Sequence, residues 1–172
     1  FQKTLPDSRV LMLFSMEAFT NWQLYDHGVT YVSPNMKGHS EIVALANGVF
    51  AQNVLFDLVP SSEIDRGTLR IEDGRIKYFD HDYDAIVVAY PNGVTQKALD
   101  FIKSCANLTK KFIGVGACEY LNDGTKCGYA FEGVEIVHEE KPAPALIAQE
   151  LMDMGVKANM TKNSCTFEDG SV

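Results

Sequence analysis

The hydrophobic residues of this chain form short continuous runs that alternate with segments of helical spacing. A continuous apolar run is typical of a strand buried on both faces, as in a parallel sheet. We predict strands at 9–15, 53–59, 83–90, 111–116 and 134–137. We predict helices at 40–52, 95–106 and 144–154, with Gly155 ending the last of them. This alternation indicates an α/β fold of three layers, an open parallel sheet with helices on both faces.

Three segments between these elements have patterns of their own. Residues 68–79 (TLRIEDGRIKYF) contain two alternating stretches around Asp73-Gly74, which predicts a small β-hairpin insertion. Residues 61–64 (SSEI) offer a helix cap and a short helical turn. Residues 27–38 carry two glycines and a proline, and we expect a long loop there.

The end of the sequence has the pattern of a second unit. Residues 166–172 (TFEDGSV) read as a strand followed by an Asp-Gly turn, without the second strand of the hairpin. We therefore expect residues 1–160 to form a single α/β domain and residues 161–172 to begin a following β-rich domain. In that interpretation the chain is a domain excised from a longer protein.

Composition and charge narrow the possible partners. The chain has 172 residues, of which 46% are hydrophobic and 22% charged, values typical of a domain with a buried core. Its 15 basic and 23 acidic residues give a formal net charge of −8, which would repel a phosphate backbone, so we expect no nucleic-acid partner. No apolar run approaches the roughly 20 residues that a membrane span requires, so we expect no membrane partner.

The sequence does not favour a cofactor or a metal. Residues 15–22 follow the first predicted strand and contain no glycine, whereas a phosphate cradle needs backbone N–H groups that can approach closely. The four histidines are far apart, and no pair has the spacing of metal ligands. The acidic stretch 80–84 (DHDYD) directly precedes a predicted strand, and we interpret it as a solvated lead-in loop.

Cys118 is the candidate nucleophile of the sequence. It follows the predicted strand at 111–116, and a cysteine on a strand-to-helix elbow can be activated by a helix N-terminus and a base. His138 and Glu17 follow other predicted strands and could complete a triad. An elbow needs small residues two positions before and after the nucleophile, and Tyr120 does not meet this requirement. The alternative is that Cys118, like the other three cysteines, is a free and mostly buried thiol.

The segment 17–27 is the candidate for a carbohydrate contact. Sugars are bound by aromatic faces together with carboxylates and amides, and this segment combines Trp22 and Tyr25 with Glu17 and Asn21. The alternative is that both rings pack beneath the long loop.

Parts of the sequence resemble accessory domains of large glycoside hydrolases. RVLMLFSMEAFTNW at 9–22 resembles the opening strand and loop of the β-galactosidase trimerisation domain. Residues 45–64 and 69–116, including FDLVP, YDAIVVAY and KFIGVG, are similar to the glutamine-amidotransferase-like domain of α-L-rhamnosidase-type enzymes. The resemblance covers most of residues 9–116 and ends there. It implies a flavodoxin-like, class I glutamine-amidotransferase-like fold without the nucleophile of that superfamily.

The resemblance also implies a function. Such a domain supports oligomerisation or walls the active site of a neighbouring barrel, which holds the catalytic carboxylates. The expected partners are other domains of the parent chain, a second copy of the chain and a saccharide. If the parent protein degrades polysaccharides, we expect it to be periplasmic or secreted. Two alternatives stay open, namely a cysteine-dependent hydrolase or amidase that uses Cys118, and a plain protein-interaction module.

Overall fold

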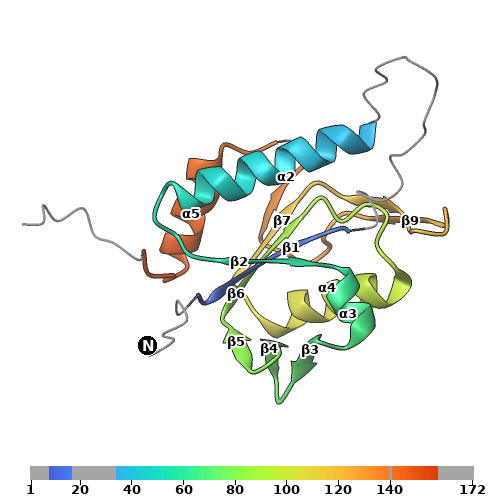
Figure 1. Cartoon of the computed structure of the whole chain (residues 1–172), viewed down its shortest axis with the longest axis horizontal. Coiled ribbons are helices and arrows are strands. Elements are labelled where there is room, and N and C mark those ends of the chain that lie inside the picture. Colours follow the sequence, from blue (N-terminus) through green and yellow to red (C-terminus); the bar gives the residue numbers. More distant parts are fainter. Residues whose placement is uncertain (1–7, 17–33, 140, 159–172) are drawn as a thin grey trace, which may run out of the picture.

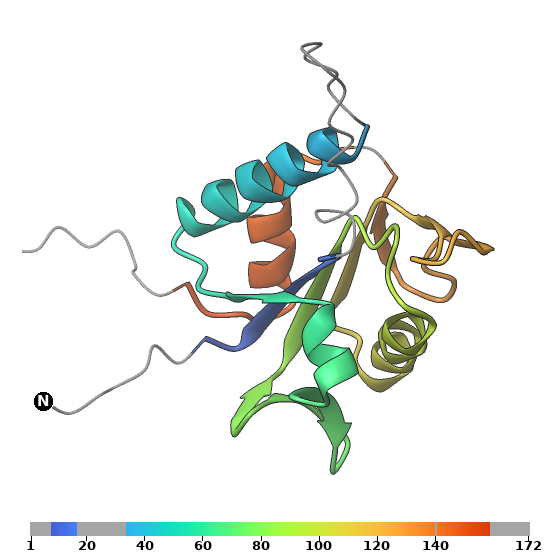
Figure 2. The ribbon, with the colours of Figure 1, turned by 45° about the vertical axis from the view of Figure 1, so that its right-hand side comes forward.

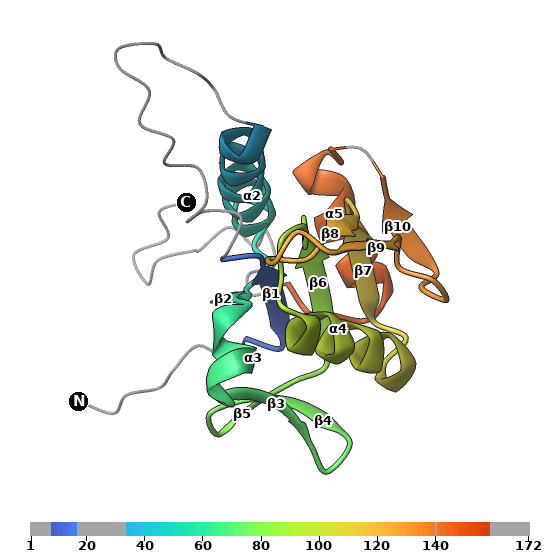
Figure 3. The same cartoon turned by 90° about the vertical axis from the view of Figure 1, so that its right-hand side faces the viewer.

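A five-stranded parallel sheet forms the centre of the molecule (Figure 1). The computed structural model describes residues 8–16, 34–139 and 141–158. The strands are β1 (Val10–Phe14), β2 (Asp57–Pro60), β6 (Ala85–Ala89), β7 (Phe112–Val115) and β10 (Ile136–His138). They lie in the order β10-β7-β6-β1-β2, and all neighbouring pairs are parallel (Figure 3). The predicted α/β fold with a central parallel sheet is therefore confirmed.

Helices cover both faces of this sheet. One face carries α2 (Pro34–Phe50) and α5 (Pro144–Asp153), and the other carries α3 (Ser62–Arg66) and α4 (Gln96–Leu108) (Figures 1 and 2). Thr95 begins α4, because its hydroxyl accepts a hydrogen bond from the Ala98 N–H at 3.1 Å. Gly155 follows the end of α5 in the left-handed conformation, as expected for a glycine after a helix.

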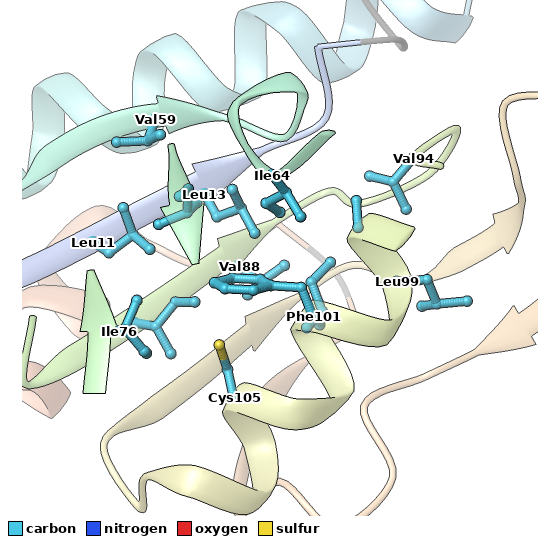
Figure 4. Close-up of a cluster of buried hydrophobic side chains, with 14 of the residues drawn as sticks. Leu11, Leu13, Val59, Ile64, Ile76, Val88, Val94, Leu99, Phe101 and Cys105 are labelled. Atoms are coloured by element: carbon cyan, nitrogen blue, oxygen red, sulfur yellow. The ribbon is translucent and has the colours of Figure 1, made fainter. Parts of the chain in front are cut away.

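The side chains of the inner strands β1, β6 and β7 divide between two cores. In β1, Val10 and Met12 pack in the core beneath α2 and α5, and Leu11 and Leu13 pack in the core beneath α4. Figure 4 shows the second core, where residues of β1 and β6 meet residues of α3 and α4. Because both faces are buried, the strands read in the sequence as unbroken apolar runs.

A small antiparallel sheet replaces the predicted hairpin insertion. The strands β3 (Leu69–Glu72) and β4 (Arg75–Tyr78) pair around the expected Asp73-Gly74 turn. A third strand, β5 (His81–Tyr83), pairs with β4, so the prediction of a lead-in loop at 80–84 is wrong for these residues. Leu69, Ile76 and Tyr83 each contribute a buried side chain to the core beneath α4. One of these three, Tyr83, belongs to the third strand β5.

A second hairpin, which the sequence analysis did not predict, follows the central sheet. It consists of β8 (Cys118–Tyr120) and β9 (Lys126–Tyr129), joined by a turn at 121–125. The alternation of apolar and polar residues is too short in these strands to be recognised from the sequence.

Three further predictions are corrected at element boundaries. Residues 34–38 belong to α2 rather than to the long loop predicted at 27–38, since Pro34 is tolerated in the first turn of a helix. Only 57–60 of the predicted strand 53–59 pair with β1, and Asn53 has a left-handed φ of +63°. Ser61 precedes α3 but makes no side-chain cap, because its hydroxyl accepts the Met16 N–H instead.

Two further predictions concern membrane spans and a second domain. Within the described ranges, none of the helices combines the length and apolar character that a bilayer span demands. The proposed second unit at 161–172 lies outside the described residues.

Candidate functional site

The carboxyl ends of the five parallel strands define the candidate site. In open α/β sheets ligands bind beyond these ends, at the point where the strand order reverses. Here the order reverses between β1 and β6. Four residues lie at this edge because each directly follows one of these strands, namely Ser15 after β1, Ser61 after β2, Tyr90 after β6 and Gly116 after β7.

The chain turns sharply where the two central strands end. Tyr90 has a φ of +50° and Gly116 a φ of +77°, and the Tyr90 N–H donates to the Val115 carbonyl at 2.8 Å. Burial and the neighbouring charge of Glu41 raise the pKa of Tyr90 to about 12, so this phenol stays protonated at neutral pH. A left-handed conformation in a tyrosine is costly, by about 1–3 kcal/mol, and such strain is concentrated at functional sites.

The β8–β9 hairpin is bound to the loop that follows β6. Asn92 Oδ1 accepts hydrogen bonds from the backbone N–H groups of Glu119 and Tyr120, at 3.0 and 2.9 Å. The Gly93 N–H donates to the Tyr120 carbonyl at 2.8 Å, and the Asn122 N–H donates to the Val94 carbonyl at 3.1 Å. These four bonds fix the hairpin over the start of α4.

Cys118 begins β8 and does not lie on a strand-to-helix elbow. The sharp left-handed turn is at Gly116, two residues earlier, where there is no side chain that could react. The Cys118 side chain is fully buried, and burial raises the pKa of its thiol to about 12. The backbone N–H groups of Gly93 and Val94 favour the thiolate but only partly offset this effect.

His138 lies at the end of β10 and is bound to a carboxylate. Its Nε2 lies 2.9 Å from Oε2 and 3.1 Å from Oε1 of Glu150, which projects from α5. The His138 carbonyl accepts the Gly116 N–H at 2.8 Å, so the histidine backbone adjoins the sharp turn. Among the described residues, no hydrogen bond joins the His138 ring to Cys118.

The carbohydrate candidates Glu17, Asn21, Trp22 and Tyr25 lie outside the described residues. The same applies to Glu17 as third member of the proposed triad. Their assignment therefore remains a prediction from the sequence.

The structure contains an aromatic cavity that the sequence analysis missed. It has a volume of about 560 Å³ and lies between the edge strand β2 and the small antiparallel sheet; its lining includes Asp57, Leu58, Tyr78, Phe79, Asp80 and Tyr83. Phe79 is 57% exposed, and the centroid of its ring lies 4.7 Å from that of the Tyr78 ring. The Tyr83 hydroxyl donates to Asp57 Oδ2 at 2.7 Å. Exposed aromatic rings beside carboxylates are suited to binding a polyhydroxylated ligand.

A signal for one of these features, the turn of the β8–β9 hairpin, was present in the sequence. The residues Asn122-Asp123-Gly124, which are typical of a turn, lie between Cys118 and Cys127. No comparable signal places Asp57 beside residues 78–83, because that contact depends on how the small sheet packs against β2.

The described part of the chain offers no cluster of three or more histidine, cysteine or acidic residues that could hold a metal ion. No protein-family model matches the chain, and comparisons with curated proteins and with solved structures also give no match. The fold and the site geometry thus define an α/β protein with a parallel sheet.

Proposed function

We propose that this chain is a non-catalytic accessory domain of a carbohydrate-active glycoside hydrolase, with a flavodoxin-like, class I glutamine-amidotransferase-like fold. Numbering the five parallel strands by their place in the chain gives the order 2-1-3-4-5, which is the order of flavodoxin-like sheets. This order supports the finer classification that the sequence resemblance implies.

The observation that carries the proposal is the identity of the residue at the turn after β7. A nucleophile elbow needs a reactive side chain at its strained position, and here that position is Gly116. The nearest thiol, Cys118, is buried and protonated at neutral pH. Such a site is suited to a scaffold and poorly suited to covalent catalysis.

The saccharide part of the proposal has two supports. Trp22, with Tyr25, Glu17 and Asn21, is the contact predicted from the sequence. The cavity beside Phe79 offers a second surface of suitable chemistry, with the exposed Phe79 and the half-buried Tyr78 near Asp57 and Asp80. The role in the parent protein would be to wall the active site of a neighbouring barrel or to support oligomerisation.

Turnover and binding assays on the purified chain test this function. We expect no hydrolysis of 4-nitrophenyl β-D-galactoside or 4-nitrophenyl α-L-rhamnoside. We expect weak chemical-shift changes at the Trp22 indole on titration with methyl β-D-galactoside or methyl α-L-rhamnoside. Turnover that is abolished by Glu17→Gln would contradict the proposal, and so would the absence of any saccharide-induced shift at both Trp22 and Phe79.

The alternatives make different predictions in the same samples. A cysteine-dependent amidase would release ammonia from L-glutamine and would lose this activity on Cys118→Ser. A plain interaction module would show neither turnover nor saccharide binding, but would self-associate in sedimentation. Phe79→Gly removes the exposed ring at the cavity. Phe50→Ala is its control, because Phe50 is also exposed, at 62%, but lies at the end of α2 on the opposite helical layer.

A further inference from the structure

Two thiols face each other across the β8–β9 hairpin. The Sγ atoms of Cys118 and Cys127 are 3.4 Å apart, and the Cys127 thiol donates to the Cys118 carbonyl at 2.9 Å. This proximity is unusual for cysteines that are not directly paired, because diagonal side chains on an antiparallel ladder are normally several ångströms further apart.

A β-bulge explains why these two thiols meet. Cys118 pairs with Tyr129 and Tyr120 pairs with Lys126, so β9 contains one more residue than β8 over the same interval. Gly128 lies within that interval with a left-handed φ of +60°. A glycine of this conformation at a bulge bends the strand and redirects the neighbouring side chain.

We propose that Cys118 and Cys127 form an intramolecular disulfide when the domain meets a small-molecule disulfide such as oxidised glutathione. Both are free thiols in the structure, and forming the bond requires the sulfurs to approach by little more than 1 Å, from 3.4 Å to a disulfide length of about 2.05 Å. A small movement of the hairpin is sufficient for this approach, because its two strands are short and β9 is already bent at the bulge.

The reaction is a pair of thiol–disulfide exchanges. Cys127 is half-buried whereas Cys118 is fully buried, so Cys127 is the thiol that the oxidant reaches first. Its thiolate attacks one sulfur of oxidised glutathione, forms a mixed disulfide and releases one glutathione thiolate. Cys118 then gives its proton to water or to that thiolate while its sulfur attacks the Cys127 sulfur, and the second glutathione thiolate leaves. The domain loses two protons, one from each thiol, and two electrons; the two glutathione thiolates take up two protons, so one oxidised glutathione becomes two reduced ones.

The disulfide would fix the site that the hairpin covers. Asn92 holds β8 through two backbone hydrogen bonds, so a covalent link from β8 to β9 also restrains the loop after β6. The inference is independent of the proposed function. It bears on the alternative function, however, because a sulfur engaged in a disulfide cannot act as a nucleophile.

Peptide mapping of the whole chain tests the proposal. The reduced protein is equilibrated with oxidised glutathione under native conditions, then unfolded and blocked with iodoacetamide, digested and analysed by mass spectrometry. We expect an internally crosslinked peptide joining residues 118 and 127, an intact mass lower by two hydrogens, and no alkylation at either cysteine. Cys127→Ser should abolish the crosslink, and Cys165→Ser, which removes a cysteine outside the described residues, should leave it unchanged.

The same experiment gives the results that would overturn the proposal. These are the recovery of Cys118 and Cys127 as separate alkylated residues, a stable glutathione adduct at Cys127, or a disulfide from either of them to Cys105 or Cys165. The mapping of the unsubstituted chain decides the question even if the Cys127→Ser protein fails to fold.

Discussion

A Cβ atom on Gly116 would lie 2.9 Å from Cδ1 of Tyr90. The two residues end the neighbouring central strands β7 and β6, and both have left-handed backbones. The close approach of the tyrosine ring therefore leaves room for hydrogen only at the position where a nucleophile elbow would carry its side chain. This single contact links the packing of the sheet edge to the absence of a reactive group at the turn.

We expect Gly116→Ala to destabilise the domain more than a matched substitution elsewhere. Gly124→Ala is the control, because Gly124 also has a left-handed φ, of +84°, but has no atom within 4 Å of its added Cβ. The conformational cost alone is about 1–2 kcal/mol, and overpacking against Tyr90 should add roughly 1–3 kcal/mol at Gly116. Urea denaturation of the two variants gives the loss in the free energy of unfolding for each. Equal losses for the two variants would show that the tyrosine ring moves aside freely.

The three described cysteines should differ in reactivity. Burial raises the pKa of Cys118 to about 12 and also raises the pKa of Cys105, whereas Cys127 is half-buried. At pH 8 roughly one Cys118 in ten thousand is then a thiolate. In a Cys165→Ser background, an alkylating maleimide, which Cys118 cannot displace from Cys127, should label one thiol quickly and two only after unfolding.

The pH dependence of this labelling shows whether the pKa of the Cys118 thiol is raised or lowered. A raised pKa keeps the thiol neutral, so its native-state labelling rate should still rise with pH above 9, where the rate of an ordinary thiol levels off. Fast labelling of Cys118 at pH 7 would argue for an activated nucleophile and against the non-catalytic function.

Glu63 should contribute to stability in a pH-dependent way. Its pKa is lowered mainly because the Thr68 hydroxyl donates to Oε2 at 2.5 Å, with Arg66 donating to Oε1 at 2.5 Å. A carboxyl whose folded pKa is depressed stabilises the fold above its unfolded pKa, near 4.5, and this stabilisation is lost as the pH falls through the folded pKa. The stability difference between the wild type and Glu63→Gln should thus be largest at neutral pH and narrow below about pH 4.5.

Thr68→Val provides the control for Glu63. It removes the hydroxyl that lowers the carboxyl pKa most, so in this background the effect of Glu63→Gln should depend less on pH. Urea denaturation between pH 3 and pH 7 gives the comparison. A stability difference that does not vary with pH would show that the carboxylate contributes nothing beyond its packing.

Phe79 should be needed for the cavity and not for the fold. Its ring is 57% exposed and its φ is +52°, a conformation that glycine adopts without strain. We expect Phe79→Gly to change the free energy of unfolding by no more than about 1 kcal/mol, since relief of strain offsets the lost contact with Tyr78. It should weaken any binding of methyl glycosides at the cavity, as measured by titration calorimetry or NMR. A loss of several kcal/mol in stability would instead identify Phe79 as a structural residue.

The order of the main elements could be predicted from the sequence, because each buried strand is an unbroken apolar run. The runs at 9–15 and 83–90 contain β1 and β6, and the helix predicted at 95–106 corresponds to α4. Their ends could not be placed as well. Asn53 lies before β2 and Tyr90 after β6, and both have left-handed backbones although both fall within predicted strands.

The small antiparallel sheets show why local pattern is insufficient. β5 has the sequence His-Asp-Tyr, which carries two polar residues and reads as a solvated loop, yet Tyr83 is buried and bonded to Asp57. Likewise β8 and β9 are too short for alternation to be recognised. These strands form because core residues of the parallel sheet and α4 lie beneath them, which is a property of the packed molecule.

The amino-acid sequence alone determined the layered α/β architecture, since hydrophobic periodicity specifies strands buried on two faces and helices buried on one. It also indicated Cys118 as the one thiol at the end of a central strand. Tertiary structure decided what that thiol can do, because burial, the turn at Gly116 and the bulge beside Cys127 arise only when distant segments pack together. Distances between side chains are set by packing, and no local pattern encodes them.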